Sequence, residues 1–321
     1  EKSPTPIICD SLSPLRETPI PTRILRYENL LRDSNFAKQV IPDLIIVLGP
    51  LPTSKTLRNW INECGAKRIV IEPRGKPVDP LSSKSHSFQI AYSTLAEIEL
   101  PKNEDGWTKR WQTAELKVEE KLTLAFAKEL PSFEGKLSRL LSEHLPSFSY
   151  LQVANSMPVR DLEWFWHASQ RGRKLFGNRG VNGIDGTLGT AMGLAHQAEQ
   201  PTFLLTGELA FLHDSNALLF NKQLSGSLNV YLINNDGGGI FEHLPISQQP
   251  EFEKCFATPQ ECDFSVLCKA HGIEFIRPQT WNEIISLIEN PIKSGIRVVE
   301  IKTDRKKDRE TRKRLLSLDS T

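Results

Sequence analysis

Several features are absent from this sequence of 321 residues, and each absence argues against a class of protein. The longest purely aliphatic run, Leu44–Leu48, is far shorter than the ~20 apolar residues that a membrane-spanning helix needs. The 40 Lys and Arg residues nearly balance 39 Asp and Glu residues, so the formal net charge is only +1. Such a balance argues against a protein that works mainly as a polycation on nucleic acid or anionic lipid. We find no internal repeat and no low-complexity tract.

Cysteine is also scarce. The five cysteines are Cys9, Cys64, Cys255, Cys262 and Cys268. Their odd number and the lack of any Cys-x-x-Cys spacing argue against a disulfide framework or a zinc site, and favour reduced thiols that are buried or half-buried. No basic start followed by an apolar stretch is found near Glu1, so no signal peptide is predicted. We therefore expect a cytoplasmic location.

What the sequence does contain is a dense alternation of predicted strands and helices. In the first third, strands are predicted at 7–9, 43–48, 68–71 and 88–92, and helices at 26–36 and 54–64. A strand, a helix and a strand at this spacing form a βαβ unit, which implies a parallel sheet with right-handed crossovers. We expect a small α/β domain over residues 1–105.

The same alternation continues to the end of the chain. Helices are predicted at 107–129, 136–145, 161–168, 186–197, 214–222, 264–271 and 281–289, and strands at 150–153, 174–176, 202–206, 229–234 and 297–301. This pattern predicts a doubly wound α/β domain with a parallel sheet over residues 106–321.

Polar residues follow two of these strands. Gly207 and Glu208 end the strand 202–206, and the sequence Asn-Asn-Asp-Gly-Gly-Gly (234–239) ends the strand 229–233. The carboxyl ends of parallel strands form the crevice in which α/β folds bind ligands. The Glu208 carboxylate, the Asn235 amide and glycine carbonyls are hard oxygen ligands, suited to Mg²⁺ held jointly with a diphosphate. Glycines also let the backbone approach phosphates closely.

The spacing of these two groups adds specificity. Either one alone would be read as an ordinary turn, but 235 − 208 gives 27 residues, room for one helix and one strand. The arrangement resembles the thiamin diphosphate signature, in which Gly-Asp-Gly is followed about 25–30 residues later by Asn-Asn. Two positions depart from it, because Glu208 stands where most of the superfamily has Asp, and Leu209 stands where many members have Gly. The longer arm of Glu could shift the position or the preference of the metal.

A second motif is the glycine-rich loop 177–187, which leads into a helix. Packing alone could require such a loop. In thiamin enzymes, however, the loop ahead of this helix carries a large aliphatic residue that wedges between the two cofactor rings, and Ile184 occupies that place. A backbone carbonyl just before it typically accepts from the pyrimidine amine.

A third motif, 155–161, follows the strand 150–153 and includes Ser156 and Arg160. It could simply be the start of a capped helix, with Arg160 and Arg179 as ordinary surface residues. Two guanidinium groups near the same strand ends would instead suit a substrate with several carboxylates.

Together these motifs resemble one family. They are Asn155–Arg160, Asn178-Arg179-Gly180 with 183–186, Gly207-Glu208-Leu209 with Asp214 and 216–218, and 234–241 (NNDGGGIF) followed by Leu244-Pro245. The family is 2-succinyl-5-enolpyruvyl-6-hydroxy-3-cyclohexene-1-carboxylate synthase, of menaquinone and phylloquinone biosynthesis. The similarity runs from about Cys9 to Arg305 and is looser in the first half, where 10–16 matches best.

The resemblance implies a thiamin diphosphate enzyme with Mg²⁺ or Mn²⁺ that decarboxylates 2-oxoglutarate and adds the resulting carbanion equivalent to isochorismate. It assigns the metal to Glu208, Asn235 and the Gly237 carbonyl. It assigns cofactor binding to Asn182, Ile184, Gly207, Glu208, Leu209, Ala210 and Asn235. It assigns substrate binding to Ser156, Arg160, Arg179, Ile240, Phe241 and Leu244.

The family has a pyrimidine-binding, a middle and a diphosphate-binding domain. The resemblance implies two doubly wound parallel-sheet domains of the thiamin diphosphate-binding fold. It makes 1–105 a middle domain that is incomplete at its N-terminus and 106–321 the diphosphate and metal domain. The glutamate that activates the aminopyrimidine is expected in the pyrimidine domain, so no catalytic residue is assigned here, and this N-terminally truncated chain is expected to be inactive alone. Assembly into a homodimer or homotetramer is expected through the pyrimidine domain.

Alternatives remain open at this point. One is another thiamin diphosphate-dependent 2-oxoacid decarboxylase or carboligase, and another is a non-catalytic cofactor-binding module. The run 302–314 holds eight Lys and Arg against three acids, and we interpret it as a solvated terminal helix docked by Leu315, Leu316 and Leu318 rather than a nucleic-acid site. His213 and His243 flank the crevice and could have either a substrate-binding or a structural role.

Overall fold

The computed structural model describes residues 5–75, 81, 85–97, 106–128, 132–167 and 169–320. The chain divides into two compact units. The first unit comprises Glu1–Asp10, Ile20–Lys128 and Arg314–Thr321, and the second comprises Ser11–Pro19 and Glu129–Lys313. These bounds differ from the expected division into 1–105 and 106–321, because the helix α4 (Trp107–Ala127) lies in the first unit. The assignment of the two parts to a middle and a diphosphate domain stays a prediction, and residues 98–105 lie outside the described part.

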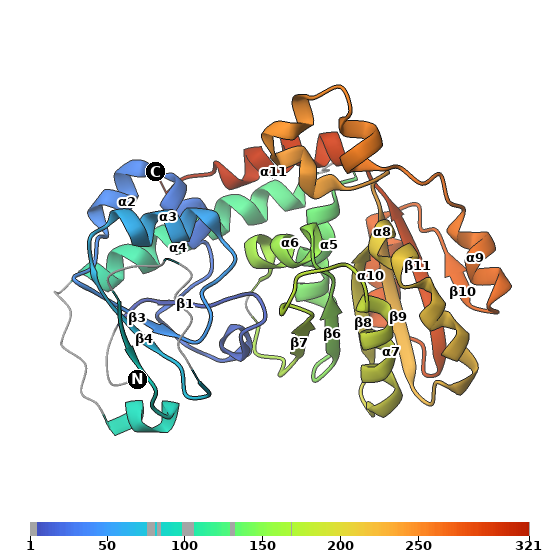
Figure 1. The fold of residues 1–321 in the computed structure, drawn as a ribbon, viewed down its shortest axis with the longest axis horizontal. Coiled ribbons are helices and arrows are strands. Elements are labelled where there is room, and N and C mark those ends of the chain that lie inside the picture. The colour runs from blue at the N-terminus through green and yellow to red at the C-terminus, as the bar shows by residue number, and fades with distance from the viewer. Residues whose placement is uncertain are drawn as a thin grey trace. The chain divides into compact units, whose positions relative to one another are not determined.

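The first unit contains a parallel three-stranded sheet in the order β3-β4-β5, coloured blue to cyan in Figure 1. Its strands are β3 (Leu44–Leu48), β4 (Lys67–Ile71) and β5 (Ser85–Phe88). The helix α3 (Lys55–Glu63) connects β3 to β4, and its first turn is capped by the Ser54 hydroxyl, which accepts from the Leu57 N–H. This confirms the predicted βαβ unit. Two short strands, β1 (Ile7–Ile8) and β2 (Arg23–Ile24), pair in parallel.

Two expectations for the first unit are wrong. The single helix predicted over 26–36 is two helices, α1 (Tyr27–Arg32) and α2 (Ser34–Gln39). Asp33 is extended between them, and its side chain accepts from the N–H groups of Asn35 and Phe36, so it ends one helix and caps the next. The strand predicted at 88–92 is also misplaced, because β5 ends at Phe88 and a 3₁₀ helix, η2, covers Tyr92–Glu97.

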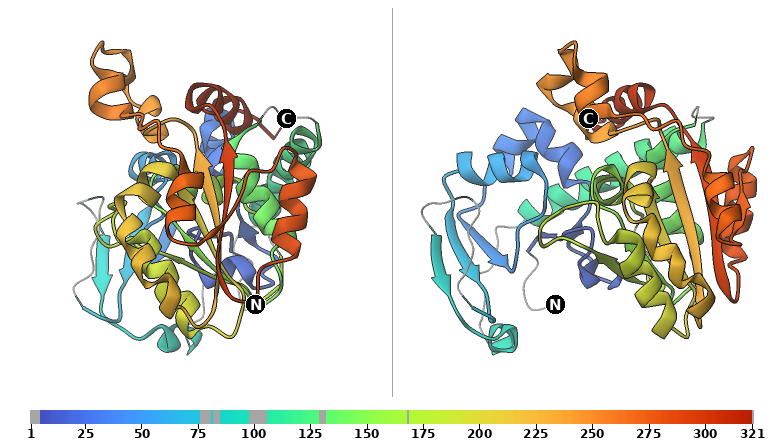
Figure 2. Two further views of the ribbon diagram at one scale, coloured as in Figure 1. Left: turned by 90° about the vertical axis from the view of Figure 1, so that its right-hand side faces the viewer. Right: turned by 45° about the vertical axis from the view of Figure 1, so that its right-hand side comes forward.

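The second unit is built on a six-stranded sheet, parallel throughout, in the order β10-β11-β9-β8-β6-β7. Its strands are β6 (Tyr150–Val153), β7 (Lys174–Gly177), β8 (Thr202–Gly207), β9 (Ser227–Asn234), β10 (Glu274–Ile276) and β11 (Gly295–Lys302). Figure 2 shows helices on both sides of this sheet. The unit therefore confirms the predicted doubly wound α/β fold.

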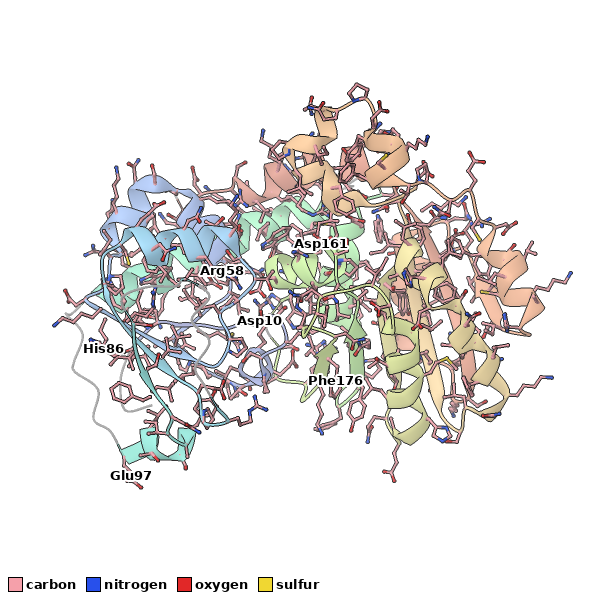
Figure 3. The ribbon with its side chains drawn as sticks, in the orientation of Figure 1. Asp10, Arg58, His86, Glu97, Asp161 and Phe176 are labelled. Atoms are coloured by element: carbon pink, nitrogen blue, oxygen red, sulfur yellow. The ribbon has the colours of Figure 1, made fainter. Side chains whose placement is uncertain are left out.

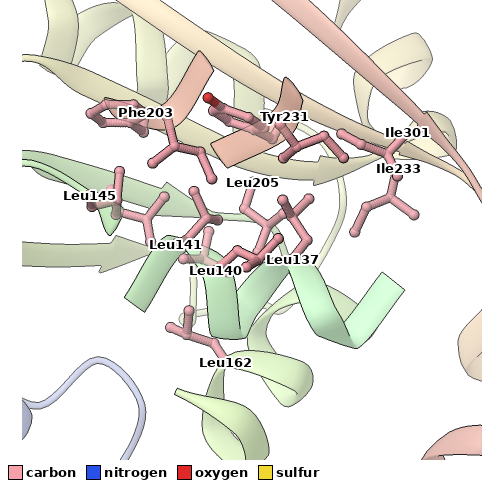
Figure 4. Packing of buried hydrophobic residues seen from close by; sticks show 14 of the residues in the cluster. Leu137, Leu140, Leu141, Leu145, Leu162, Phe203, Leu205, Tyr231, Ile233 and Ile301 are labelled. Carbon is pink, nitrogen blue, oxygen red and sulfur yellow. The ribbon is translucent and has the colours of Figure 1, made fainter. Parts of the chain in front are cut away.

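Alternate residues of the central strands enter two separate cores. Phe203, Leu205 and Tyr231 pack against the helices α5 (Glu134–His144), α6 (Met157–Phe165) and α10 (Trp281–Glu289), as Figure 4 shows for α5. Leu204 and Val230 pack on the other face, against α7 (Thr187–Gln197) and α9 (Phe264–Ala270). Each fully buried side chain of this size contributes about 1.5–3 kcal/mol. Because both faces are covered, β8 and β9 are almost continuously buried.

Several expectations for the second half need correction. The segment 214–222, predicted to be an α-helix, is a 3₁₀ helix, η3 (Ser215–Gln223), and the α-helix that precedes it, α8 (Glu208–His213), was not predicted. The strand β10 had no counterpart among the predictions. The terminal helix α11 (Arg305–Leu316) buries Leu315 and Leu316 as expected, but it also buries Arg305, Asp308 and Arg312. It is therefore not a simple solvated helix.

The cysteines follow the expectation with one exception. Cys9 and Cys268 are buried and Cys64 and Cys262 are half-buried, whereas Cys255 is exposed. Burial raises the pKa of the Cys268 thiol to about 12, so this group behaves as a small apolar side chain. No helix within the described ranges is both long enough and apolar enough to cross a membrane.

Candidate cofactor and metal site

The site is built where three neighbouring strands of the second unit end. The register pairs Gly207 at the end of β8 with Ile233 near the end of β9, and pairs Leu205 with Val153 at the end of β6. The segments that follow these strands therefore leave the same edge of the sheet. The structure thus brings together Glu208, Asn235 and the segment beginning at Asn155, as their positions after predicted strands suggested.

Glu208 connects two of these strand ends. It is the first residue of α8 and only 5% exposed, and its Oε1 accepts a hydrogen bond from the Gly237 N–H. The nearby backbone N–H of Asn235 also favours the charged form of this carboxylate and so lowers its pKa. Burial raises the pKa of Glu208 to about 7, and the negative Glu134 adds to that rise, while the backbone donors lower it. The carboxylate is therefore in a place that a cation would stabilise.

Asn235 presents one satisfied and one unsatisfied polar atom. Its side chain is 6% exposed, and Nδ2 donates to Oε2 of Glu134 at 2.7 Å. Its Oδ1 is buried and has no hydrogen-bond partner in the described part of the chain. A buried amide oxygen without a partner costs about 1–3 kcal/mol. This orphaned oxygen fits a metal ligand, which is the role predicted for Asn235.

The backbone of the following loop is tightly fixed. Asp236 and Gly237 have φ angles of 65° and 128°, and a Cβ on Gly237 would lie 2.3 Å from the Ala257 carbonyl oxygen. The Gly238 N–H donates to that same carbonyl at 2.7 Å. Only glycine fits at position 237. The Gly237 carbonyl, which is predicted to be a metal ligand, therefore belongs to a fixed stretch of backbone.

A carboxylate, an amide oxygen and a backbone carbonyl therefore come from adjacent strand ends. All three are oxygen donors of the kind that Mg²⁺ and Mn²⁺ take, so the residues fit the expected metal. No cluster of three or more His, Cys, Asp and Glu suited to a metal occurs among the described residues, and the predicted set needs only one carboxylate.

The predicted anion-binding residues lie on α6 and on the loop after β7. Nη1 of Arg160 donates to the Ser156 carbonyl at 2.7 Å, and Ser156 has φ 69° and ψ −133°, a conformation rare for residues other than glycine. Burial lowers the pKa of Arg160, the nearby Arg179 lowers it further, and Asp161 raises it. Arg160 and Arg179 are thus close enough to repel each other, and an anion between them would relieve that repulsion.

Asn155 joins this pair to the glycine-rich loop. Its side-chain oxygen accepts from Nη1 of Arg179, and its side-chain nitrogen donates to the carbonyls of Asn178, at 2.8 Å, and Gly183. Sequence reasoning included Asn155 in a motif without giving it a role. Gly183 directly precedes Ile184, and its carbonyl lies in the stretch where the pyrimidine amine is expected to bind. Asn155 uses one of the two lone pairs of that carbonyl.

The remaining predicted residues lie on the same loops, and their roles stay predictions. Half-buried residues are Ile184, Gly207, Leu209, Ile240 and Phe241, whereas Ala210 is buried and Asn182, Leu244, His213 and His243 are exposed. The Phe241 ring packs edge-on against Phe256, with ring centroids 5.7 Å apart. Nε2 of His243 lies 3.3 Å from Nη1 of Arg312.

A buried network behind Asn235 was missed entirely. The Arg312 guanidinium donates to both oxygens of Asp161, each at 2.7 Å, and also to Oε1 of Glu134. Figure 3 labels Asp161 on α6. Burial raises the pKa of Asp161, while Arg312 opposes the rise. Asp308 also belongs to this network, because its Oδ1 accepts from the Glu134 N–H at 3.3 Å.

Arg305 anchors the loop after β9 from another direction. It donates from Nε to Glu242 at 2.9 Å, from Nη1 to the Asp236 carbonyl and from Nη2 to Glu253. Arg305, Asp308 and Arg312 recur at spacings of three and four residues, which places them on one face of a helix. That spacing was the available signal for an inward-facing charged stripe.

Comparison with known proteins adds an independent line of evidence. A family described as "Thiamine pyrophosphate enzyme, C-terminal TPP binding domain" matches residues 162–301. A 2-succinyl-5-enolpyruvyl-6-hydroxy-3-cyclohexene-1-carboxylate synthase of Trichodesmium erythraeum is 43% identical over 98% of this chain and 55% of its own length. The synthases of that name from Rippkaea orientalis and Synechococcus elongatus are 42% and 41% identical, over 97% of this chain and 54% of theirs. The chain thus spans about half the length of these relatives.

Proposed function

We propose that the whole protein is a transferase of the same type as the 2-succinyl-5-enolpyruvyl-6-hydroxy-3-cyclohexene-1-carboxylate synthases. The chain is homologous to these synthases over 97% of its length. It would decarboxylate 2-oxoglutarate and add the succinyl-semialdehyde carbanion equivalent to isochorismate. A step in menaquinone or phylloquinone biosynthesis and a cytoplasmic location belong to the same proposal.

One observation supports this function most strongly. Glu208 joins the ends of β8 and β9 by accepting from the Gly237 N–H, and the buried Oδ1 of Asn235 has no partner within the described ranges. A site that leaves an amide oxygen unsatisfied beside a buried carboxylate is suited to a bound cation. Glu208, Asn235 and the Gly237 carbonyl would hold Mg²⁺ or Mn²⁺, which would anchor the diphosphate.

The other residues would bind and orient the reactants. In such enzymes thiamin diphosphate supplies the carbanion chemistry. Asn182, Ile184, Gly207, Leu209 and Ala210 would line the cofactor, with Ile184 supporting its bent conformation.

Substrate binding would rest on a second set of side chains. Ser156, Arg160 and Arg179 would bind carboxylates, because neighbouring guanidinium groups form charge-assisted hydrogen bonds with them. Burial lowers the pKa of Arg160 and the nearby Arg179 lowers it further. Ile240, Phe241 and Leu244 would form an apolar wall that keeps water from the reacting carbon.

The proposal is made for the whole protein. The family's activating glutamate belongs to its pyrimidine-binding domain, which is expected outside these residues, and assembly into a homodimer or homotetramer is expected through that domain. That the 321 residues do not turn over substrate alone therefore stays a prediction.

The test uses the full-length protein with 2-oxoglutarate, isochorismate, thiamin diphosphate and Mg²⁺. We expect CO₂ release and formation of the succinylated cyclohexene product. Glu208→Ala should reduce both by more than about 100-fold, because it removes the only carboxylate of the metal set. Glu199→Ala removes an exposed glutamate of the same unit and should leave the rate unchanged. Absence of CO₂ release by the wild-type protein would overturn the proposal and favour a non-catalytic module.

A second candidate is another thiamin diphosphate-dependent 2-oxoacid decarboxylase or carboligase. The paired Arg160 and Arg179 argue against a small substrate without a second carboxylate. Turnover of pyruvate in preference to 2-oxoglutarate would favour this candidate over the proposed function.

A further inference from the structure

We infer that Glu134 is a positioning residue for the metal site, which turns the side-chain amide of Asn235 so that its oxygen is available to the cation. The inference rests on the proposed function and deepens it. Glu134 lies at the start of α5, 101 residues before Asn235, and no sequence motif connects the two.

The chemistry of the contact decides which way the amide faces. Oε2 of Glu134 lies 2.7 Å from Nδ2 of Asn235, and the two side chains are 2% and 6% exposed. A carboxylate only accepts hydrogen bonds, so the amide must direct its NH₂ group toward Glu134. The reversed amide would bring two oxygens together in a buried place. Glu134 therefore leaves Oδ1 of Asn235 as the atom that is without a protein partner among the described residues.

The amide is confined on another side as well. A Cβ on Gly239 would lie 2.9 Å from Nδ2 of Asn235, so the backbone at Gly239 passes directly against the amide group. Two residues further on, the Gly237 N–H donates to Oε1 of the Glu208 carboxylate. The Asn235 side chain is thus confined between the backbone at Gly239 and the Glu134 carboxylate.

Glu134 is itself held in place. Its second oxygen, Oε1, accepts from Nη2 of Arg312, whose guanidinium is anchored on both oxygens of Asp161. The Glu134 N–H donates to Asp308. Each carboxylate oxygen of Glu134 therefore has its own donor, so rotation of this carboxylate would break both contacts.

A glutamine at position 134 tests this geometry because it has nearly the same shape. Its amide can accept at only one end. If its oxygen stays on Arg312, its NH₂ group faces Asn235, and the Asn235 amide must turn its oxygen toward position 134. Glu134→Gln should then weaken Mn²⁺ binding by about 10–100-fold, the effect typical of losing a group that orients a metal ligand.

The measurement is a titration of the full-length protein with Mn²⁺ in the presence of thiamin diphosphate, in which electron paramagnetic resonance detects the free ion. Glu17→Gln is the matched control, because Glu17 is a buried glutamate of the second unit. Its carboxylate binds the Arg173 guanidinium at 2.9 Å. We expect both variants to lower the melting temperature, and only Glu134→Gln to change the Kd for Mn²⁺ by more than about twofold.

A rescue variant separates orientation from general damage. Asn235→Asp in the Glu134→Gln background has an oxygen on both sides, so it can accept from Gln and still offer an oxygen to the metal. We expect this double variant to bind Mn²⁺ more tightly than Glu134→Gln alone. In the wild-type background, Asn235→Asp places two carboxylates in contact and should weaken binding.

Three outcomes would overturn the inference. Wild-type affinity in Glu134→Gln, or an equal loss in Glu17→Gln, would show that Glu134 does not orient the ligand, while the proposed function would stand. A failure of the wild-type protein to bind Mn²⁺ with thiamin diphosphate present would overturn the proposed function and the inference together.

Discussion

Individual residues of the candidate site have a strained backbone. Six described residues other than glycine have positive φ, and three of them lie in predicted site segments: Ser156, Asn182 and Asp236, with φ of 69°, 66° and 65°. Asn and Asp tolerate the left-handed region comparatively well, but Ser156 combines its φ with a ψ of −133°, which only glycine adopts easily. Such strain is maintained where the surrounding structure requires a particular direction of the chain.

Ser156→Gly should therefore stabilise the fold. Glycine adopts this conformation without a steric penalty, so we expect the free energy of unfolding to rise by about 1 kcal/mol, measured by urea denaturation. The loss of the hydroxyl should raise KM for 2-oxoglutarate. Ser156→Ala is the control, since it removes the hydroxyl and keeps the strain. A glycine variant less stable than the alanine variant would contradict this explanation.

The predictability of a residue depended on whether its partners are near in sequence. Glu208 and Asn235 were identified because each directly follows an apolar strand, and their separation accommodates one helix and one strand. Glu134 and Arg312 were missed because their contact spans 178 positions and neither belongs to a motif. Arg312 was interpreted as part of a solvated helix because acids interleave with the cations of the run 302–314 and no aromatic stacking residue is present there.

Elements were predicted well where local chemistry and packing agree. The bounds of β6 and α10 match the predictions, and α10 begins with Thr280, whose hydroxyl accepts from the Glu283 N–H in a standard cap. Elements were misplaced where a polar side chain competes with the helix, as Asp33 does, and where 3₁₀ turns replace an α-helix, as after Asp214. The apolar periodicity of a 3₁₀ segment is too similar to that of a short α-helix to separate the two.

The loop after β9 offers a test at the scale of a structural element. An alanine at position 237 would place its Cβ 2.3 Å from the Ala257 carbonyl oxygen and would have to adopt a φ of 128°. Gly237→Ala should cost about 2–4 kcal/mol of unfolding free energy through strain and overpacking, and should weaken Mn²⁺ binding with thiamin diphosphate present.

Gly193→Ala is the control for that variant. Gly193 lies within α7, and a Cβ there would meet nothing within 4 Å. This change should raise stability by up to about 1 kcal/mol, because alanine favours the helix more than glycine does. Equal stability of the two variants in thermal melts would show that the close approach at Gly237 is not required.

At the scale of the whole molecule, the candidate site belongs to one compact unit. Glu208, Asn235, Gly237 and their supporting network all lie within the second unit, Ser11–Pro19 with Glu129–Lys313. Cofactor binding should therefore stabilise that unit directly. A ligand at 100 times its Kd adds about 2.7 kcal/mol to the stability of the part that binds it.

Hydrogen exchange measures this effect. In the full-length protein, thiamin diphosphate with Mg²⁺ should slow exchange at the N–H groups of 207–209 and 235–239, and leave β3, β4 and β5 of the first unit unchanged. Mg²⁺ without thiamin diphosphate, and Glu208→Ala with both, are the controls and should show little protection. Protection confined to the first unit would place the binding site elsewhere.

Local patterns in the sequence determined the fold class, the parallel strands of both units and the position of polar residues after β8 and β9. These follow from apolar runs and turn residues, which depend on neighbours within a few positions. The tertiary structure alone decided that Glu134 faces the Asn235 amide and that three charged residues of α11 point inward. Such contacts join helices and loops that are distant in the chain, and a buried charge is selected by the partners that packing brings to it.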